Sequence, residues 1–243
     1  MINILITAGG TSEPIDSVRS ITNTGTGRLG SLIADAFAAE PSVGKIFYVC
    51  ARNAVRPQSD KMTAVEVQSV SDLQAAITEI TSKYTIDIII HSMAVSDYRV
   101  RAVSTSEQVA PLLQETEDIL QAMEATDIRK NGGKLSSHMV SPLILLEPTP
   151  KILPELRKLA PKAVIVGFKL LSQVPRETLI ETAYRLLSEN ACDFVLANDS
   201  SDIYGDAHKG YLIDSERNIQ TFATKQEIAS GILTTIIKQE KKS

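Results

Sequence analysis

The sequence predicts an α/β fold with a doubly wound, mainly parallel and Rossmann-like sheet. Short apolar runs with strand character alternate along the chain with segments that have helical spacing, as in strand–helix–strand units. One run, residues 86–91, is mostly isoleucine, which is typical of a strand buried on both faces. With 243 residues, of which 43% are hydrophobic, the chain can bury the core of one large domain covering residues 1–243.

The individual elements follow from periodicity and turn residues. Strands are predicted at residues 2–7, 45–50, 63–68, 86–91, 163–168 and 194–197. Helices are predicted at residues 29–39, 70–84, 177–188 and 224–238. Residues 211–214 and 219–222 are strand-like and flank a turn at residues 215–218, which predicts a C-terminal hairpin.

Residues 99–148 interrupt the alternation of strands and helices. Within them, residues 108–125 have a helical pattern, residues 131–133 form a turn, and residues 139–146 are extended. Because the composition stays continuous, we expect an inserted flap at about residues 99–148 and not a second domain.

Composition narrows the functional class. A net charge of −4 argues against a broad nucleic-acid interface, which needs a basic surface. No apolar run is long enough to span a membrane, and the first residues lack the basic region and cleavage site of a signal peptide. The two cysteines, Cys50 and Cys192, fit a reducing compartment. We therefore expect a cytoplasmic protein with neither nucleic acid nor membrane as a partner.

The most informative stretch is the polar loop at residues 9–30, between the first strand and the first helix. Its glycines stand at both ends of the loop, at Gly9, Gly10, Gly25, Gly27 and Gly30. Glycine lets backbone N–H groups approach a ligand closely, and a helix N-terminus favours negative charge. The loop therefore predicts an anion site. A long surface loop with ordinary turn residues is the alternative.

The same loop also permits a second interpretation, in which the protein is a nicotinamide-dependent oxidoreductase. Residues 25–30 match G-x-G-x-x-G, but in dinucleotide-binding folds the motif follows the first strand at once, whereas here residues 8–24 intervene. Arg52 stands where an acidic residue is expected, and it could contact the 2′-phosphate of NADP. No tyrosine is followed by a lysine four residues later, so one common catalytic pair of such enzymes is missing.

Several candidate residues come directly after predicted strands, where ligands bind in doubly wound sheets. Asp97 could accept hydrogen bonds from a ribose or a base, although a helix cap or turn is an equal alternative. Phe168 could flank a base, or it could be a core aromatic. Lys134, after two glycines, could reach a phosphate, although most lysines are simply solvated. The histidines and cysteines show no metal-binding spacing, and no Walker motif is present.

Short segments in a fixed order resemble phosphopantothenate–cysteine ligase, also called phosphopantothenoylcysteine synthetase, in its single-domain bacterial form. In the first loop they are Thr-Ala-Gly-Gly-Thr at residues 7–11, Glu-Pro-Ile-Asp at 13–16, Val-Arg at 18–19 and Ile-Thr-Asn at 21–23. Ala-Val-Ser-Asp-Tyr at 94–98, Gly-Lys-Leu-Ser-Ser at 133–137, Thr-Pro-Lys-Ile at 149–152, Gly-Phe at 167–168 and Ala-Asn-Asp at 197–199 follow. The resemblance covers essentially the whole chain.

The resemblance implies a ligase of coenzyme A biosynthesis. Such enzymes activate the carboxylate of 4′-phosphopantothenate with CTP, or with ATP in eukaryotes, and Mg²⁺ assists. An acyl nucleotidylate and pyrophosphate form, and the amine of cysteine then displaces the nucleoside monophosphate. The resemblance also implies a homodimer in which the flap contributes across the interface. Because the chain starts at the ligase strand, we expect no flavin and no decarboxylase activity.

The resemblance also assigns roles to residues. It implies that Asn23, Arg19 and Lys134 are catalytic, with Asn23 contacting the acyl intermediate. The implied substrate-binding residues are Arg19, Asn23, Gly25, Gly27 and Ala94. The implied nucleotide-binding residues are Gly9, Gly10, Ser92, Met93, Asp97, Lys134, Thr149, Pro150, Lys151, Ile152 and Phe168. Metal ligands are not assigned.

One departure from the family pattern stands out. Basic residues for the triphosphate are expected just before Asp193, but residues 188–192 read Ser-Glu-Asn-Ala-Cys. Independently of this departure, a regulator that binds a nucleotide without turning it over is a third hypothesis, from a different functional class.

Overall fold

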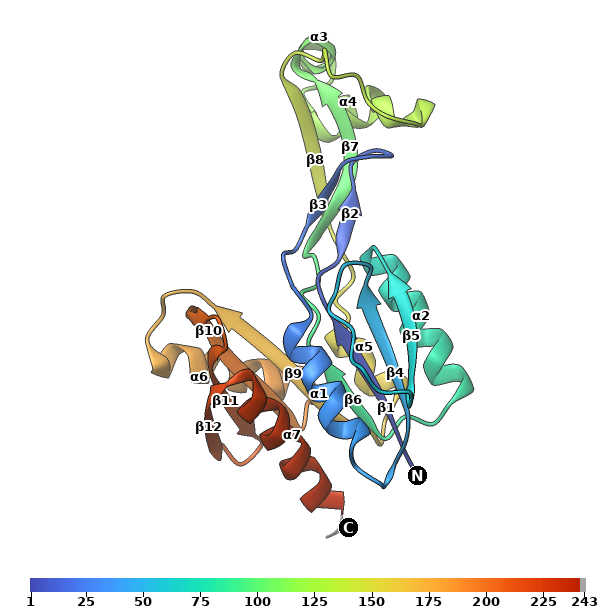
Figure 1. Cartoon of the computed structure of the whole chain (residues 1–243). Helices are drawn as coiled ribbons and strands as arrows, with labels where there is room; N and C mark the ends of the chain where they lie inside the picture. The colour runs from blue at the N-terminus through green and yellow to red at the C-terminus, as the bar shows by residue number, and fades with distance from the viewer. Residues whose placement is uncertain (241–243) are drawn as a thin grey trace.

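The computed structural model describes residues 1–240, apart from the side chains of residues 130, 131, 239 and 240. The strands of its main sheet are β1 (Ile2–Ala8), β4 (Val43–Ala51), β5 (Met62–Val67), β6 (Ile88–His91), β9 (Val164–Leu171), β10 (Phe194–Tyr204), β11 (Ala207–Asp214) and β12 (Ile219–Thr224). These eight strands lie in the order β12-β11-β10-β9-β6-β1-β4-β5 (Figure 1). The strands from β5 to β10 are parallel, and β11 and β12 add an antiparallel hairpin.

Helices cover both faces of this sheet. The helices α1 (Arg28–Ala38) and α7 (Lys225–Glu240) pack on one face, and α2 (Val70–Lys83), α5 (Leu153–Leu159) and α6 (Arg176–Glu189) pack on the other. Side chains along β1 alternate between the two faces and so contribute to both cores. Ile4 and Ile6 pack in the core under α1 and α7, and Leu5 packs in the core under α2, α5 and α6. The predicted fold class, a doubly wound and mainly parallel sheet with a C-terminal hairpin, is confirmed.

The chain changes direction at β1. From β1 it passes through α1 to β4 on one side, and later through α2 to β6 on the other side. The loops that leave the carboxyl ends of β1 and β6 therefore diverge, and a crevice opens between them. This topology locates the region in which a ligand is expected.

A flap stands away from the main sheet. Its strands β7 (Tyr98–Thr105) and β8 (Pro142–Pro148) pair antiparallel, and α3 (Ser106–Thr116), α4 (Ile119–Ala125) and the 3₁₀ helix η1 (Ile128–Asn131) connect them. A small hairpin of β2 (Ser12–Pro14) and β3 (Ser20–Thr22) rises beside β7 and β8 (Figure 1). No described helix has both the length and the apolar composition needed to cross a bilayer.

The structure differs from the sequence predictions in three places. Residues 108–125 were expected to be one helix, but Glu117 adopts a left-handed conformation with φ of 52° and ends α3. Asp118 then starts α4, because its carboxylate accepts a hydrogen bond from the N–H of Leu120 at 2.9 Å. The strand β7 and the helix α5 were not predicted. A shift in register between Val100 and Ala102 interrupts the alternation in β7, and α5 has only 7 residues.

The first loop also contains more structure than its polar sequence indicated. Asp16 accepts hydrogen bonds from the N–H groups of Val18 and Arg19, at 2.9 and 2.8 Å, and so forms the turn between β2 and β3. Glu13 is buried and accepts a hydrogen bond from the N–H of Val70 at 2.8 Å, which ties the hairpin to the start of α2. Glu13 is therefore an anchor of the loop.

Candidate functional site

The carboxyl end of β1 is covered by the return of its own loop. A Cβ atom added at Gly10 would lie 2.0 Å from the carbonyl oxygen of Asn23, and one added at Gly25 would lie 2.4 Å from the carbonyl oxygen of Gly9. The two backbone segments cross in direct contact, so only glycine fits at Gly10 and Gly25. The crossing fixes the position of Asn23 above the end of β1.

The loop after β6 is joined to the same crossing by hydrogen bonds. The N–H of Ala94 donates to the carbonyl oxygen of Gly9 at 2.8 Å, and the N–H of Thr11 donates to that of Ala94 at 3.0 Å. The hydroxyl of Thr11 donates to Ser96 Oγ at 2.9 Å. The two loops thus form one rigid floor.

Three clefts open around this floor. The first, which we call the Asp97 cleft, has a volume of about 470 Å³. Its walls come from the loop after β6, the segment before α5, the end of β9 and the end of α6. The lining includes Met93, Ala94, Asp97, Pro150, Lys151, Ile152, Phe168, Lys169, Leu186, Glu189 and Asn190. Seven predicted nucleotide-binding or substrate-binding residues therefore meet in one cleft.

Asp97 and Lys151 form an ion pair inside this cleft. Their side chains are 69% and 64% exposed. An exposed ion pair contributes little to stability. Each side chain can therefore leave its partner and bind a ligand at a small cost in free energy. Both positions were predicted to bind nucleotide, and the structure brings them into contact.

The second cleft, which we call the Gly27 cleft, lies at the N-terminus of α1 and has a volume of about 360 Å³. It is lined by Gly9, Gly25, Gly27, Gly30, Ser92, Met93, Ala94, Phe168, Leu170, Asn198, His208 and Lys225, together with Thr24, Thr26, Arg28, Leu29 and Ile203. Gly27 is the N-cap of α1 with φ of 73°, and a Cβ there would meet Ala54 at 2.8 Å. Glycine is therefore required at the point where the loop enters the helix.

The third and largest cleft, which we call the Asn23 cleft, has a volume of about 1090 Å³. Asn23, Gly10 and Gly25 line it, together with residues 51–55 after β4 and residues 66–68 at the end of β5. It shares Thr24, Gly25 and Thr26 with the Gly27 cleft. The Gly27 and Asp97 clefts share Met93, Ala94, Phe168 and Leu170. The three clefts are thus contiguous around the floor.

Arg19 and Lys134 lie elsewhere. Arg19 Nη2 donates to the carbonyl oxygen of Leu135 at 2.9 Å, and the N–H of Leu135 donates to Asp16 Oδ2 at 3.0 Å. The pairing with Arg19 holds the pKa of Asp16 well below its usual range. This clamp joins the tip of the β2–β3 hairpin to the segment after η1, so Arg19 and Lys134 are near each other but apart from the three clefts.

The side chains of Thr149 and of the two cysteines are buried inside the protein. Thr149, a predicted nucleotide-binding residue, is buried, and its hydroxyl donates to the carbonyl oxygen of Ser96 at 2.5 Å. Cys50 and Cys192 are free and buried on opposite faces of the sheet, and burial raises the pKa of the Cys192 thiol to about 12. Neither thiol is activated as a nucleophile.

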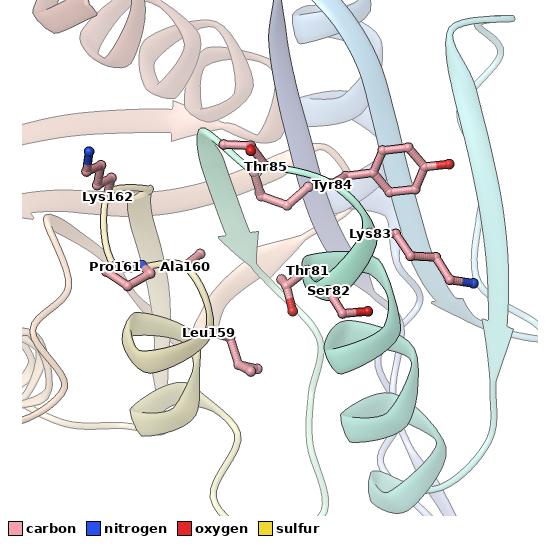
Figure 2. A pocket seen from close by; sticks show the side chains of 10 residues that line it. Thr81, Ser82, Lys83, Tyr84, Thr85, Leu159, Ala160, Pro161 and Lys162 are labelled. Atoms are coloured by element: carbon pink, nitrogen blue, oxygen red, sulfur yellow. The ribbon is translucent and has the colours of Figure 1, made fainter.

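A further hollow lies at the opposite edge of the sheet. Figure 2 shows its lining side chains between the end of α2 and the segment after α5. Its volume is about 400 Å³. Lys83 and Lys162 stand on opposite sides of it, and their ammonium groups point away from each other (Figure 2). These charges do not converge on a common point, so the clefts at the carboxyl edge are the better site.

Some residues of the clefts carried no local signal in the sequence. Lys169 and Asn198 come directly after predicted strands, but neither was assigned a role, because most lysines are solvated and Asn198 belonged only to a short motif. His208 and Lys225 were not candidates, because the hairpin of β11 and β12 brings them to the N-terminus of α1 from far along the chain. Their proximity depends on strand order, which the local sequence does not state.

Comparison with known proteins identifies the family. The profile of the DNA/pantothenate metabolism flavoprotein C-terminal domain matches residues 1–132 and 127–239. The chain belongs to this family. The family predicted from the ordered motifs is thereby confirmed, and the role of this family in pantothenate metabolism fits a site for anionic ligands.

Individual relatives agree with this assignment. The coenzyme A biosynthesis bifunctional protein CoaBC of Thermococcus kodakarensis is 28% identical over 97% of this chain, and the match covers 51% of that protein. The chain spans about half the length of the curated relatives that it matches. The crystal structure of the DNA/pantothenate metabolism flavoprotein from Streptococcus pneumoniae is 31% identical, covers 98% of this chain and 100% of that one, and superposes with a TM-score of 0.85. Cab2 in complex with phosphopantothenate-cysteine shares the fold, with a TM-score of 0.72 at 17% identity over 99% of this chain and 87% of that one.

Proposed function

We propose that the protein is a phosphopantothenate–cysteine ligase that joins 4′-phosphopantothenate to cysteine through an acyl nucleotidylate. The observation that carries the proposal is the shared boundary of the Asp97 and Gly27 clefts at Met93, Ala94 and Phe168. Two ligands bound in these clefts would meet there. A reaction between a carboxylate and a nucleotide phosphate requires such a meeting point.

We assign the nucleoside triphosphate to the Asp97 cleft. The predicted nucleotide-binding residues Met93, Asp97, Pro150, Lys151, Ile152 and Phe168 line it. Lys151 and Lys169 supply positive charge in the absence of the basic residues expected before Asp193. The carboxylate of Asp97 can accept hydrogen bonds from the sugar or the base.

We assign 4′-phosphopantothenate to the Gly27 cleft. Gly25, Gly27 and Ala94 line it, and Asn23 lies in the cleft next to it. A carboxylate oxygen of this substrate attacks the α-phosphorus of the nucleotide, and the bond to the β-phosphate breaks to release pyrophosphate. The amine of cysteine then attacks the acyl carbon, loses a proton and displaces the nucleoside monophosphate. Backbone N–H groups and lysines suit the stabilisation of these anionic states.

We propose that Mg²⁺ enters as a complex with CTP or ATP. Among the described residues, no three carboxylate, histidine or cysteine side chains are grouped as a metal site. Mg²⁺ is commonly held by one or two carboxylates together with substrate phosphates. Asp97 and Glu189 line the Asp97 cleft and could supply such contacts.

We further propose a cytoplasmic homodimer of single-domain subunits in which the flap reaches the partner. Exposed apolar side chains are concentrated on the flap, at Tyr98, Ile119, Leu120, Val140, Leu143, Ile144 and Leu146. Such patches are typical of protein interfaces. Since Arg19 and Lys134 lie beside the flap and apart from the clefts of their own chain, their predicted catalytic role requires the cleft of the second subunit.

The test measures pyrophosphate release from 4′-phosphopantothenate, Mg²⁺ and either CTP or ATP, with and without cysteine. We expect release that depends on phosphopantothenate, and an amide product that depends on cysteine. Asn23→Ala is expected to lower product formation by about a hundredfold or more without loss of stability. Folded protein that releases no pyrophosphate with either nucleotide would refute the ligase and leave a non-catalytic nucleotide-binding protein.

A further inference from the structure

His208 is buried at the Gly27 cleft without a function in the proposal above. It lies on β11 opposite Ile203 of β10, and only 6% of its surface is exposed. Further along β11, a Cβ atom added at Gly210 would lie 3.0 Å from the side chain of Ile228 of α7. His208 itself lines the cleft at the N-terminus of α1, together with Gly27 and Arg28.

The imidazole of His208 has unmet hydrogen-bonding capacity. Both ring nitrogens are buried, and neither has a hydrogen-bond partner among the described residues. A buried polar group without a partner costs about 1–3 kcal/mol, so native proteins rarely retain one that has no use. Burial lowers the pKa of His208 to about 4, and the charge of Lys225 adds to this effect. At neutral pH the ring is thus uncharged and offers one N–H donor and one acceptor.

The surroundings of His208 favour an anion. The α1 helix has 11 residues, and its first turn contains neither a side-chain cap nor an acidic residue. The N–H of Arg28 donates to Thr26 Oγ1 at 3.3 Å, and no acidic side chain in this turn offsets the helix dipole, which favours an anion in the cleft. Lys225 and Arg28 belong to the same lining, and the ammonium group of Lys225 donates to the carbonyl oxygen of Gly205 at 2.7 Å. By contrast, Thr224 and Glu227 cap the nearby N-terminus of α7, so this helix end is satisfied by its own chain.

We propose that His208 donates a hydrogen bond to a phosphoryl group of the ligand held at the N-terminus of α1. The inference rests on the proposed function, which supplies two phosphorylated ligands, and it assigns the group to the phosphate monoester of 4′-phosphopantothenate. The C-terminal hairpin thereby acts as a specificity element, because an analogue without the phosphate would leave the imidazole unpaired. The enzyme should discriminate against pantothenate for this reason.

The first test compares His208→Leu with His208→Gln in the ligase assay and in calorimetric binding of 4′-phosphopantothenate, pantothenate and the nucleotide. His208→Leu should weaken binding of 4′-phosphopantothenate by about tenfold, leave binding of pantothenate unchanged, and be as stable as wild type, because it removes an unsatisfied polar group. His208→Gln, which keeps a donor, should restore part of the affinity. His138→Leu, an exposed histidine outside the three clefts, is the matched control.

The outcomes separate the candidate ligands. If only nucleotide binding weakens in His208→Leu, the phosphoryl subsite stands but belongs to the nucleotide. If no ligand binds more weakly in folded His208→Leu, or if the variant loses stability as a structural histidine would, the proposal is overturned. Binding of inorganic phosphate, followed by the ¹⁵N shifts of the His208 ring in the wild-type protein, tests the subsite even if no ligase activity is found.

Discussion

The carboxyl edge of the sheet and the flap hold their functional residues by different means. At the edge, Gly10 and Gly25 let two backbone segments cross in contact, and buried hydrogen bonds join the loops after β1 and β6. At the flap, hydrogen bonds from Arg19 and Asp16 to the backbone of Leu135 hold the tip of the β2–β3 hairpin against the segment after η1. Exposed apolar side chains lie on the same flap. The contacts at the edge lie within one chain, whereas the flap exposes apolar side chains to solvent, which the proposed dimer would cover.

The largest expected effect breaks the backbone crossing at the edge. Gly10→Ala would place a Cβ atom 2.0 Å from the carbonyl oxygen of Asn23, a contact that only movement of the backbone can relieve. We expect a loss of at least about 3 kcal/mol in the free energy of unfolding, measured by urea denaturation. Gly205→Ala is the control, since Gly205 has a φ of 57° but open space around its Cβ. Its loss should be about 1 kcal/mol, and equal losses in both variants would contradict a contact-based crossing.

The next effect concerns the apolar surface of the flap. Ile144→Asp should abolish dimers in light scattering after size exclusion, because it places a charge on a surface that needs an apolar partner. The stability of the monomer should change by no more than about 0.5 kcal/mol, since Ile144 is 43% exposed. Ligase activity should fall together with the dimer if Arg19 and Lys134 act in the partner's cleft.

The control for Ile144→Asp is the same substitution at an exposed isoleucine outside the flap. Ile219→Asp alters a residue that is 37% exposed on the edge strand β12. This variant should remain dimeric. If Ile144→Asp stays dimeric too, or if its monomer keeps full activity, the flap is not the required interface.

A decrease in pH should affect the edge before the flap. Burial lowers the pKa of His91 and of His208 from 6.5 to about 4. Between these values the unfolded chain binds protons that the folded protein cannot, so stability falls as the pH decreases from about 6.5 towards 4. Each histidine should cost about 2 kcal/mol at pH 5. Because the pKa of Asp16 lies well below its usual 3.8, its contribution is lost only below about pH 4.

Urea denaturation at pH 7.5 and pH 5.0 measures this difference. His208→Leu should remove about half of the stability loss, whereas His138→Leu should leave it unchanged. Hydrogen exchange of the Leu135 amide, which donates to Asp16, should show that the clamp persists at pH 5. If His208→Leu loses as much stability between pH 7.5 and pH 5.0 as the wild type does, the ring of His208 accepts a proton in the folded wild-type protein, which contradicts the prediction.

The smallest effect on stability is expected at the Asp97–Lys151 ion pair. Because both side chains are exposed, Lys151→Met should change the free energy of unfolding by less than about 0.5 kcal/mol. The same variant should raise the KM for the nucleotide by about tenfold, because the proposed site places the charge of Lys151 against an anionic ligand. Lys162→Met, at the opposite edge of the sheet, should alter neither quantity. An unchanged KM for Lys151→Met would remove Lys151 from the nucleotide site.

Much of the fold could be predicted because its strands are locally distinct. The isoleucines of β6 indicated a strand buried on both faces, and the repeating apolar positions of α2 indicated one helix face. The short helix α5 and the irregular strand β7 could not be predicted, because too few residues repeat a pattern in either. The break at Glu117 depends on a left-handed backbone at a residue type that gives no warning of it.

The site was predicted in part for the same reason. Residues of the loops after β1, β6 and β9 share one edge in any parallel sheet, and the predicted residues Met93, Ala94, Asp97, Lys151 and Phe168 do meet there. The separation of Arg19 and Lys134 from this edge could not be foreseen, because it follows from the rise of the β2–β3 hairpin along the flap. Their catalytic role remains a prediction.

The sequence by itself determined the alternation of strands and helices, the glycine positions and the family. These are local properties, since backbone conformation and side-chain period act over a few residues. The tertiary structure decided that Asn23 crosses over Gly10, that three clefts join, and that His208 reaches the start of α1. Each of these depends on which strands become neighbours and which loops cross, and contacts between distant segments are fixed only when the whole sheet has formed.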